Sequence, residues 1–164
     1  MFDKFGEMNS SQEINELAEN LFNENDIESL QAMAKENGIG QEYVEDYLKG
    51  NVFNLCDPLT AALGKLEVEK EELKPTHLMR DWVGYIEGQC LENDDMAAAV
   101  RKKGKSLRGC IAALLKYSFT DYVKVDPEIV KLSGIKAPGL KDIGFGVPGM
   151  GEAKQIIRNY YMGG

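Results

Sequence analysis

The stretch 57-DPLTAALGKLEVEKEELKP-75 indicates the fold class of this chain. It opens with a helix start, because Asp is a favoured N-cap and Pro is tolerated at the first helical position. Apolar residues then recur at helical spacing, at Leu59, Ala62, Leu63 and Leu66. The second half is acidic and ends at Pro75, so it is either a solvated helix end or a linker. We place a candidate boundary there, between an acidic helical region (1–74) and a basic helical region (75–164).

Upstream of this stretch the pattern is also helical. Ser10 and Glu13 form a capping box ahead of an apolar face. A second short helix is predicted over 26–37 with Gly38 as its stop, and a third ends at Gly50. Together these segments predict a small three-helix bundle.

Downstream, helical spacing continues. A strongly amphipathic segment carries Met79, Trp82, Val83, Ile86 and Cys90. An alanine-rich helix follows, Gly104 breaks the chain, and Ser106 caps a further helix. Asp126 and Pro127 predict another helix start, as Asp57 and Pro58 do. Residues 134–150 are predicted to be a loop. A last helix ends in two tyrosines, Tyr160 and Tyr161. With no convincing strand, the predicted fold class is all-α, a small multi-helix bundle with two helical subdomains.

Composition indicates a globular protein of the cytoplasm. The chain has 164 residues, 43% hydrophobic and 28% charged, which is enough to bury a core. Its three cysteines are an odd number without metal-ligand spacing, which favours a reducing compartment. We expect no membrane-spanning segment, because no apolar run approaches the required length.

The two parts of the chain carry net charges of opposite sign. Residues 1–73 hold 5 Lys+Arg and 17 Asp+Glu, whereas residues 74–164 hold 14 and 10. This asymmetry favours a protein that meets charged partners, although solvated helix faces would also produce it. The acidic candidates for partner binding are Glu13, Glu16, Glu19, Glu42, Glu45 and Asp46, and the basic candidates for partner or nucleic-acid binding are Arg101, Lys102, Lys103, Lys105 and Arg108.

The basic run contains Gly104-Lys105-Ser106, which matches the end of a phosphate-binding P-loop. That motif requires a glycine where this chain has Ala99, inside a predicted helix, so the nucleotide-binding interpretation fails. A helix that starts after Ser106 still presents free N–H groups beside cations. We therefore predict an anion site there, for a phosphate of nucleic acid or a carboxylate of a protein.

The segment 147–151 resembles the hairpin of helix-hairpin-helix modules, in which glycine amides bind a nucleic-acid phosphate. The match covers the hairpin and the second helix only, because residues 138–146 are too glycine-rich for a clean first helix. Gly149, Gly151 and Lys154 are its candidate residues. The alternative interpretation is a flexible loop that caps a docking helix. The tyrosine pair near the end of the chain either docks the last helix on the bundle or serves a protein interface or base stacking.

Nothing in the sequence indicates catalysis. His77 is the single histidine, so no nucleophilic triad or HExxH site can be formed. Carboxylate pairs such as Asp94 and Asp95 are adjacent and point apart on a helix. We predict no enzyme activity, no catalytic residue, no cofactor and no metal.

The basic region resembles the PcfK-like proteins of conjugative plasmids and integrative elements in Firmicutes. The resemblance covers residues 78–162, and the front half does not match. Its motifs are Tyr85-Ile86, the acidic turn 92–95, the alanine-rich run 97–100, the basic run 103–111 and the closing helix 153–161. The same family includes small type II-A anti-CRISPR proteins that inhibit Cas9.

The resemblance implies a non-enzymatic accessory protein of a mobile genetic element. The concrete expectation is a protein-binding inhibitor of a CRISPR nuclease effector such as Cas9, whose positively charged channel the carboxylates would occupy. The basic run would alternatively hold guide RNA or DNA that the effector displays. A second hypothesis is direct nucleic-acid binding in conjugation or replication, through the basic run and the hairpin. A third is a structural adaptor without nucleic-acid contact.

Overall fold

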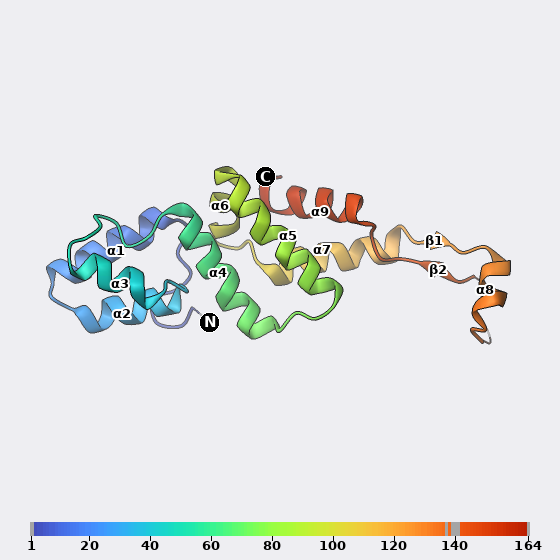
Figure 1. Cartoon of the computed structure of the whole chain (residues 1–164), viewed down its shortest axis with the longest axis horizontal. Helices are drawn as coiled ribbons and strands as arrows, with labels where there is room; N and C mark the ends of the chain where they lie inside the picture. The colour runs from blue at the N-terminus through green and yellow to red at the C-terminus, as the bar shows by residue number, and fades with distance from the viewer. Residues whose placement is uncertain (1, 137, 139–141, 164) are drawn as a thin grey trace.

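The computed structural model describes residues 2–136, 138 and 142–163. Its elements in chain order are α1 (Ser11–Asn23), α2 (Ile27–Glu36), α3 (Gln41–Leu48), α4 (Pro58–Leu73), α5 (Leu78–Glu92), α6 (Asp94–Arg101), α7 (Leu107–Thr120), β1 (Val123–Lys124), α8 (Pro127–Ser133), β2 (Gly144–Phe145) and α9 (Met150–Met162). The molecule is elongated, with α1–α3 at one end and the β1–α8–β2 segment at the other (Figure 1). The predicted all-α multi-helix fold is confirmed.

The N-terminal unit is built by α1, α2 and α3, which pack in sequence order. Each helix contributes one apolar face, and the faces meet in a common core. Its buried side chains are Ile14, Ala18, Leu21, Leu30, Met33, Ala34, Ile39, Val44, Leu55, Cys56 and Ala61. The predicted small bundle is therefore present at the N-terminus.

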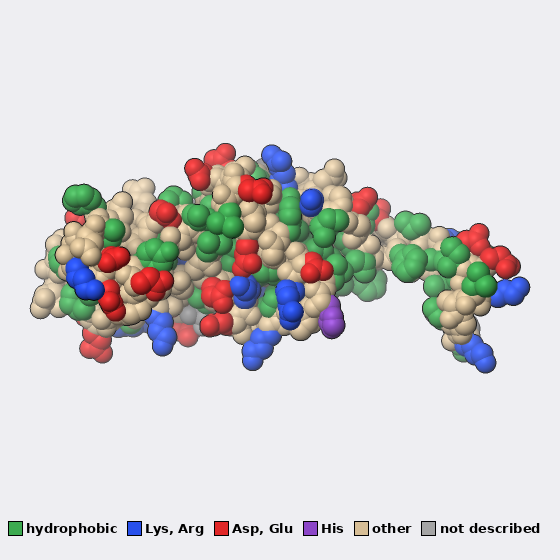
Figure 2. All heavy atoms as spheres, viewed as in Figure 1, with side chains coloured by type: hydrophobic (Ala, Val, Ile, Leu, Met, Phe, Trp, Pro, Cys, Tyr) green, Lys and Arg blue, Asp and Glu red, His purple; other side chains and the backbone are tan. Residues whose placement is uncertain are grey.

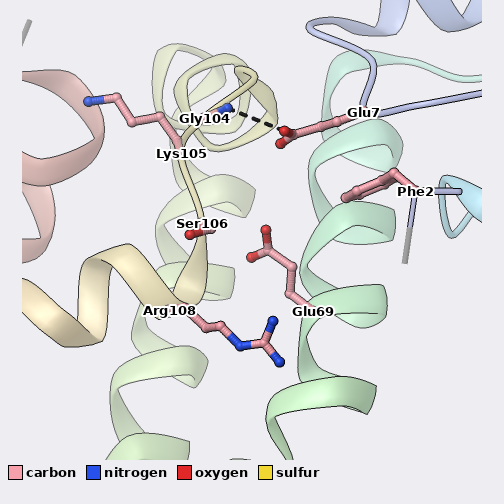
Figure 3. Close-up of a pocket in the computed structure, with 7 residues that line it drawn as sticks. All are labelled: Phe2, Glu7, Glu69, Gly104, Lys105, Ser106 and Arg108. Atoms are coloured by element: carbon pink, nitrogen blue, oxygen red, sulfur yellow. Dashed lines mark hydrogen bonds between the residues drawn. The ribbon is translucent and has the colours of Figure 1, made fainter.

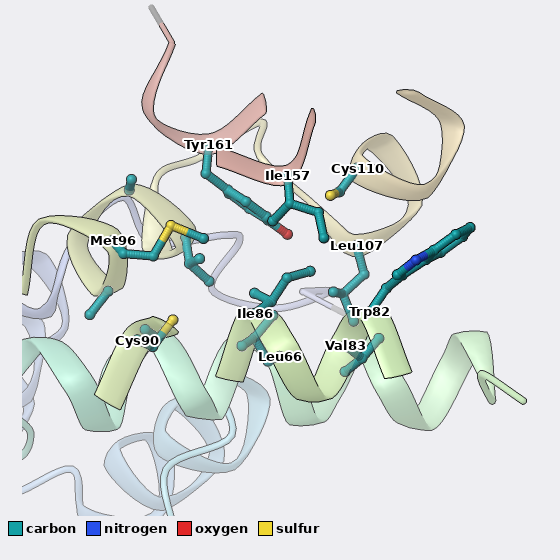
Figure 4. Close-up of a cluster of buried hydrophobic side chains, with 14 of the residues drawn as sticks. Leu66, Trp82, Val83, Ile86, Cys90, Met96, Leu107, Cys110, Ile157 and Tyr161 are labelled. Carbon is teal, nitrogen blue, oxygen red and sulfur yellow. The ribbon is translucent and has the colours of Figure 1, made fainter. Parts of the chain in front are cut away.

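The central unit has a separate core between α4, α5, α6, α7 and α9. Figure 4 shows Trp82 and Ile86 of α5 facing Leu107 of α7, with Tyr161 of α9 closing the other side. The last helix therefore docks on the central unit through both tyrosines, with Tyr161 buried and Tyr160 partly buried against the core, as one interpretation of the pair expected.

Helix α4 joins the two units because it belongs to both cores. Ala61 is buried in the N-terminal core, and Ala62 and Leu66, less than two turns later, are buried in the central one. The acidic segment after Leu66 is a continuation of this helix and not a linker, since α4 runs to Leu73. The predicted boundary at residue 74 follows the end of α4, whereas the two cores divide within the helix.

Helix starts follow the capping signals of the sequence. Asp57 accepts a hydrogen bond from the N–H of Thr60 at 2.7 Å, with Pro58 at the first helical position. The Ser10 hydroxyl accepts from the N–H of Glu13 at 3.2 Å. The Glu13 carboxylate reaches back one residue further than the capping box requires, to the N–H of Asn9 at 2.6 Å. These two hydrogen bonds fix the residues that lead into α1 against its first turn.

Two short strands correct the expectation that the chain has none. β1 and β2 pair antiparallel, with Val123 opposite Phe145 and Lys124 opposite Gly144. β2 falls inside the segment 134–150 that was predicted to be a loop, of which residues 137 and 139–141 lie outside the described part. Two-residue strands carry too little alternation to be detected by a period-2 pattern, so the sequence signal was absent.

Within the described residues, no helix combines the length and the apolar character that crossing a bilayer requires.

Candidate functional site

The acidic and basic parts of the chain meet at a charged junction, formed by residues 2–9, helix α4 and the turn 102–106 between α6 and α7. Figure 3 shows the Glu7 carboxylate hydrogen-bonded to Gly104 of that turn, and both residues line a pocket of about 200 Å³. One Glu7 oxygen accepts from the Lys65 ammonium at 2.5 Å, and the other accepts from the N–H of Gly104 at 3.3 Å. Asn9 accepts from the N–H of Lys103 at 3.1 Å. The N-terminal segment therefore fastens the turn onto α4.

Lys65, Glu69 and Arg101 are buried charged residues at this junction. Lys65 donates a second hydrogen bond, to the carbonyl of Lys102 at 2.9 Å. Arg101 donates to the Asn37 side-chain oxygen and to the carbonyl of Ala61. Burial lowers the pKa of the Lys65 ammonium and raises the pKa of the Glu69 carboxyl. Each cation thus holds backbone or side-chain oxygens of a neighbouring element in place.

The predicted anion site at the start of α7 contains a carboxylate of the chain itself. Glu69 accepts a hydrogen bond from the N–H of Leu107 at 2.7 Å, in the first turn of α7. A carboxylate at a helix N-terminus is stabilised by the free N–H groups and the helix dipole. Of the two anions considered from the sequence, the structure contains the carboxylate, and it is intramolecular.

Because burial raises the pKa of Glu69, the free energy of unfolding should depend on pH. An acid whose pKa is raised by folding stabilises the protein while protonated, and that contribution is lost as pH rises from its unfolded value of about 4.5 towards the native pKa. Glu69→Gln keeps an acceptor for Leu107 and removes the titration. We expect the stability of this variant, relative to wild type, to improve as pH rises above about 4.5 and to level off once pH exceeds the native pKa of Glu69, as measured by urea unfolding. A difference that stays constant over this range would contradict the prediction.

The remaining cations of the basic run differ in how far they are engaged. Lys105 donates to the carbonyl of Tyr160 at 2.6 Å and lies over its ring, and the Tyr160 hydroxyl accepts from the N–H of Ser106. Arg108 forms an ion pair with Glu72 at 3.2 Å. Lys102 and Lys103 are exposed residues on the turn.

Arg101 requires a correction. It was predicted as a surface residue for partner or nucleic-acid binding, but only 1% of it is exposed and its guanidinium lies under the Phe2 ring. The alanine-rich helix α6 places its last residue inward, where Asn37 and Ala61 accept its hydrogen bonds. A run of like charges in the sequence does not distinguish a buried cation from its exposed neighbours.

The helix-hairpin-helix interpretation is also corrected. Gly149 is the N-cap of α9 and Gly151 lies inside that helix, but the segment before them is β2 and not a first helix. Lys154 lies over the ring of Tyr85 on α5, 5.2 Å from its centroid. These residues start and dock the last helix, as the alternative interpretation expected.

The acidic candidates are exposed on two helices of the N-terminal unit. Glu16 and Glu19 of α1 line a groove of about 440 Å³ together with Asp57 and Phe53. On α3, Glu42 is exposed, Glu45 forms an ion pair with Lys49, and Asp46 accepts a hydrogen bond from Asn51. These three carboxylates do not line the groove. Glu13 is committed to the cap of α1. The structure thus brings together two of the six predicted carboxylates.

Sequence reasoning missed both Phe53 and the buried charges. Phe53 is fully exposed beside Glu16 and Glu19, although its position in a short connecting segment gave no periodic signal. Lys65 and Glu69 had a usable signal, since they are one helical turn apart and Lys65 directly precedes the core residue Leu66. A charged pair on the inward side of an amphipathic helix indicates a buried ion network.

The three cysteines, Cys56, Cys90 and Cys110, are buried and free. Burial raises the pKa of each thiol to about 12. Because the thiolate is the reactive form, none of them is poised as a nucleophile near neutral pH.

Comparison with known proteins gives one partial likeness. No family model matches the chain, and no solved structure matches it. Over 93 residues it is 30% identical to an arylacetonitrilase of Hypocrea virens (strain Gv29-8 / FGSC 10586), which is 57% of this chain and 28% of that protein. The chain therefore spans little more than a quarter of the length of this curated relative.

Proposed function

We propose that this protein is a non-enzymatic accessory protein of a mobile genetic element that binds and inhibits a nucleic-acid-guided nuclease such as Cas9. The supporting observation is the acidic groove of the N-terminal unit, lined by Glu16, Glu19, Asp57 and the fully exposed Phe53. An exposed aromatic ring among carboxylates suits a basic protein surface, because the ring anchors the contact and the charges steer the approach. A nuclease channel that holds nucleic acid is such a surface.

The state of the basic run favours protein binding over direct nucleic-acid binding. Of the five cations in the run, Arg101 is buried, Lys105 is bonded to Tyr160 and Arg108 is paired with Glu72. Two exposed cations therefore remain, Lys102 and Lys103. Retention of nucleic acid depends on cations that are free to neutralise phosphates. The carboxylates of the groove, in contrast, are exposed on α1 and at the start of α4.

The test uses purified Cas9, with and without guide RNA, and measures both co-elution with this protein and cleavage of target DNA. Wild-type protein should co-elute and suppress cleavage. Glu16→Lys combined with Glu19→Lys should raise the concentration for half inhibition by about tenfold or more, since two attractive contacts become repulsive. Phe53→Ser should act in the same direction.

The matched control is Glu42→Lys combined with Glu45→Lys, which makes the same charge change on α3. A much smaller effect is expected, and an equal loss would contradict the groove as the contact. Raising salt from 50 to 300 mM should weaken inhibition by wild type. Full cleavage with no co-elution would overturn the proposed function, and a gel shift with DNA and RNA would then test the nucleic-acid hypothesis.

A further inference from the structure

The described residues of segment 121–148, called the arm below, extend away from the central unit (Figure 1). β1 and β2 form its stem, where the N–H of Val125 also donates to the carbonyl of Ile143 at 2.8 Å. Lys124 and Asp142 form an ion pair across the stem at 2.9 Å. Between the strands lies α8, capped by Asp126 at its start and ended by Gly134.

The arm has little within it to stabilise its helix. α8 has seven residues, none of them buried. Isolated helices shorter than about 12 residues are marginal in water, and so is a two-stranded hairpin without a covered face. The ordered arm therefore gains stability from any surface that covers its apolar side chains.

The arm and the end of α7 that leads into it expose many large apolar side chains (Figure 2). Phe119 is 80% exposed, Phe145 72% and Leu132 85%. Tyr122, Val123, Ile129, Ile135 and Val147 are also exposed. Taking 150–250 Å² for an aromatic side chain and somewhat less for an aliphatic one, these eight residues expose roughly 900 Å². A standard-size interface buries about 800 Å² on each partner, so this surface is sufficient for one.

Charge favours a second copy of this chain as the occupant. Residues 121–148 hold four Lys and four Asp+Glu, so the arm is neutral and the rest of the chain carries the whole net charge of −8. Two such bodies repel at close range, whereas two extended neutral arms can meet while the bodies stay apart. Because Lys124 and Asp142 neutralise each other within the stem, the same patch of two copies can meet without like-charge repulsion, as in an isologous two-fold interface.

We propose that two copies of this protein dimerise arm to arm, through the apolar side chains of the β1–α8–β2 segment. This inference is independent of the proposed function, because the acidic groove lies in the N-terminal unit at the opposite end of the molecule.

The test is sedimentation equilibrium of the full-length protein between about 1 and 200 µM, at 0.15 M and 0.5 M salt. Wild type should be a dimer at the upper concentrations, and more so at 0.5 M salt, where repulsion between the bodies is screened. Phe145→Ser combined with Leu132→Ser should raise the dissociation constant at least about tenfold. Both side chains are exposed, so far-UV circular dichroism of the variant should differ from wild type by no more than the seven residues of α8.

The matched control is Phe53→Ser, which removes an equally exposed phenylalanine from the N-terminal unit and should leave the dimer unchanged. A second readout uses Leu132→Cys, which adds an exposed thiol to a chain whose own three cysteines are buried. Mild oxidation should link the two copies of this variant through position 132, and wild type should remain uncrosslinked. A wild-type monomer at 200 µM in both salts, or a dimer indifferent to the arm substitutions, would overturn the proposal.

Discussion

Replacement of Arg101 by alanine is expected to lower the free energy of unfolding by about 3–5 kcal/mol, because it removes one member of a buried ion network. Arg101 is 1% exposed and donates to Asn37 of the N-terminal unit and to Ala61 of α4. Without the guanidinium, the buried Asn37 side-chain oxygen is left without its donor, whereas the Ala61 carbonyl lies within α4. The substitution also removes the cation that offsets Glu7 and Glu69.

The measurement is urea unfolding at pH 7, followed by circular dichroism. Lys103→Ala is the matched control, since it removes a cation two residues away whose side chain is exposed, and a change within about 0.5 kcal/mol is expected. Arg101→Lys should fall between the two, because it keeps the charge but cannot serve both acceptors through a planar fork. Equal stabilities of Arg101→Ala and Lys103→Ala would show that the network does not support the junction.

The helices were predictable because their signals are local. Asp57 with Pro58, and Ser106 before α7, act within one turn of the chain, and the structure has the expected caps at both. An apolar face repeats every three to four residues whether or not its partner helix is known. The fold class therefore followed from patterns that need no tertiary information.

The charged junction was not predictable to the same extent, because it depends on contacts between distant segments. Glu7 and Lys65 are 58 residues apart, and Arg101 and Asn37 are 64 apart. The sequence showed an acidic front and a basic back as two free surfaces. In the structure the two regions contact each other: Glu7 and Glu69 accept hydrogen bonds from backbone N–H groups of the turn and of α7, and Glu72 forms an ion pair with Arg108.

Gly38→Ala is expected to lower the free energy of unfolding by about 3 kcal/mol or more, through two effects at one residue. Gly38 has a φ of +71°, and a left-handed conformation costs a residue with a Cβ about 1–2 kcal/mol. A Cβ there would also overlap the backbone carbonyl of Gly64 on α4. Because that neighbour is backbone, the end of α2 and α4 must move apart, and overpacking of this kind typically costs a further 1–3 kcal/mol.

Gly50→Ala separates the two effects, because Gly50 has a similar φ of +73° and no atom within 4 Å of an added Cβ. It should cost about 1–2 kcal/mol in the same urea experiment, from conformation alone. Gly38 follows Asn37, the acceptor for Arg101, so moving the end of α2 should also loosen that contact. Gly38→Ala and Arg101→Ala should therefore be less than additive when combined. Full additivity, or equal costs at Gly38 and Gly50, would mean that α2 and α4 do not approach closely enough to hold Asn37 against Arg101.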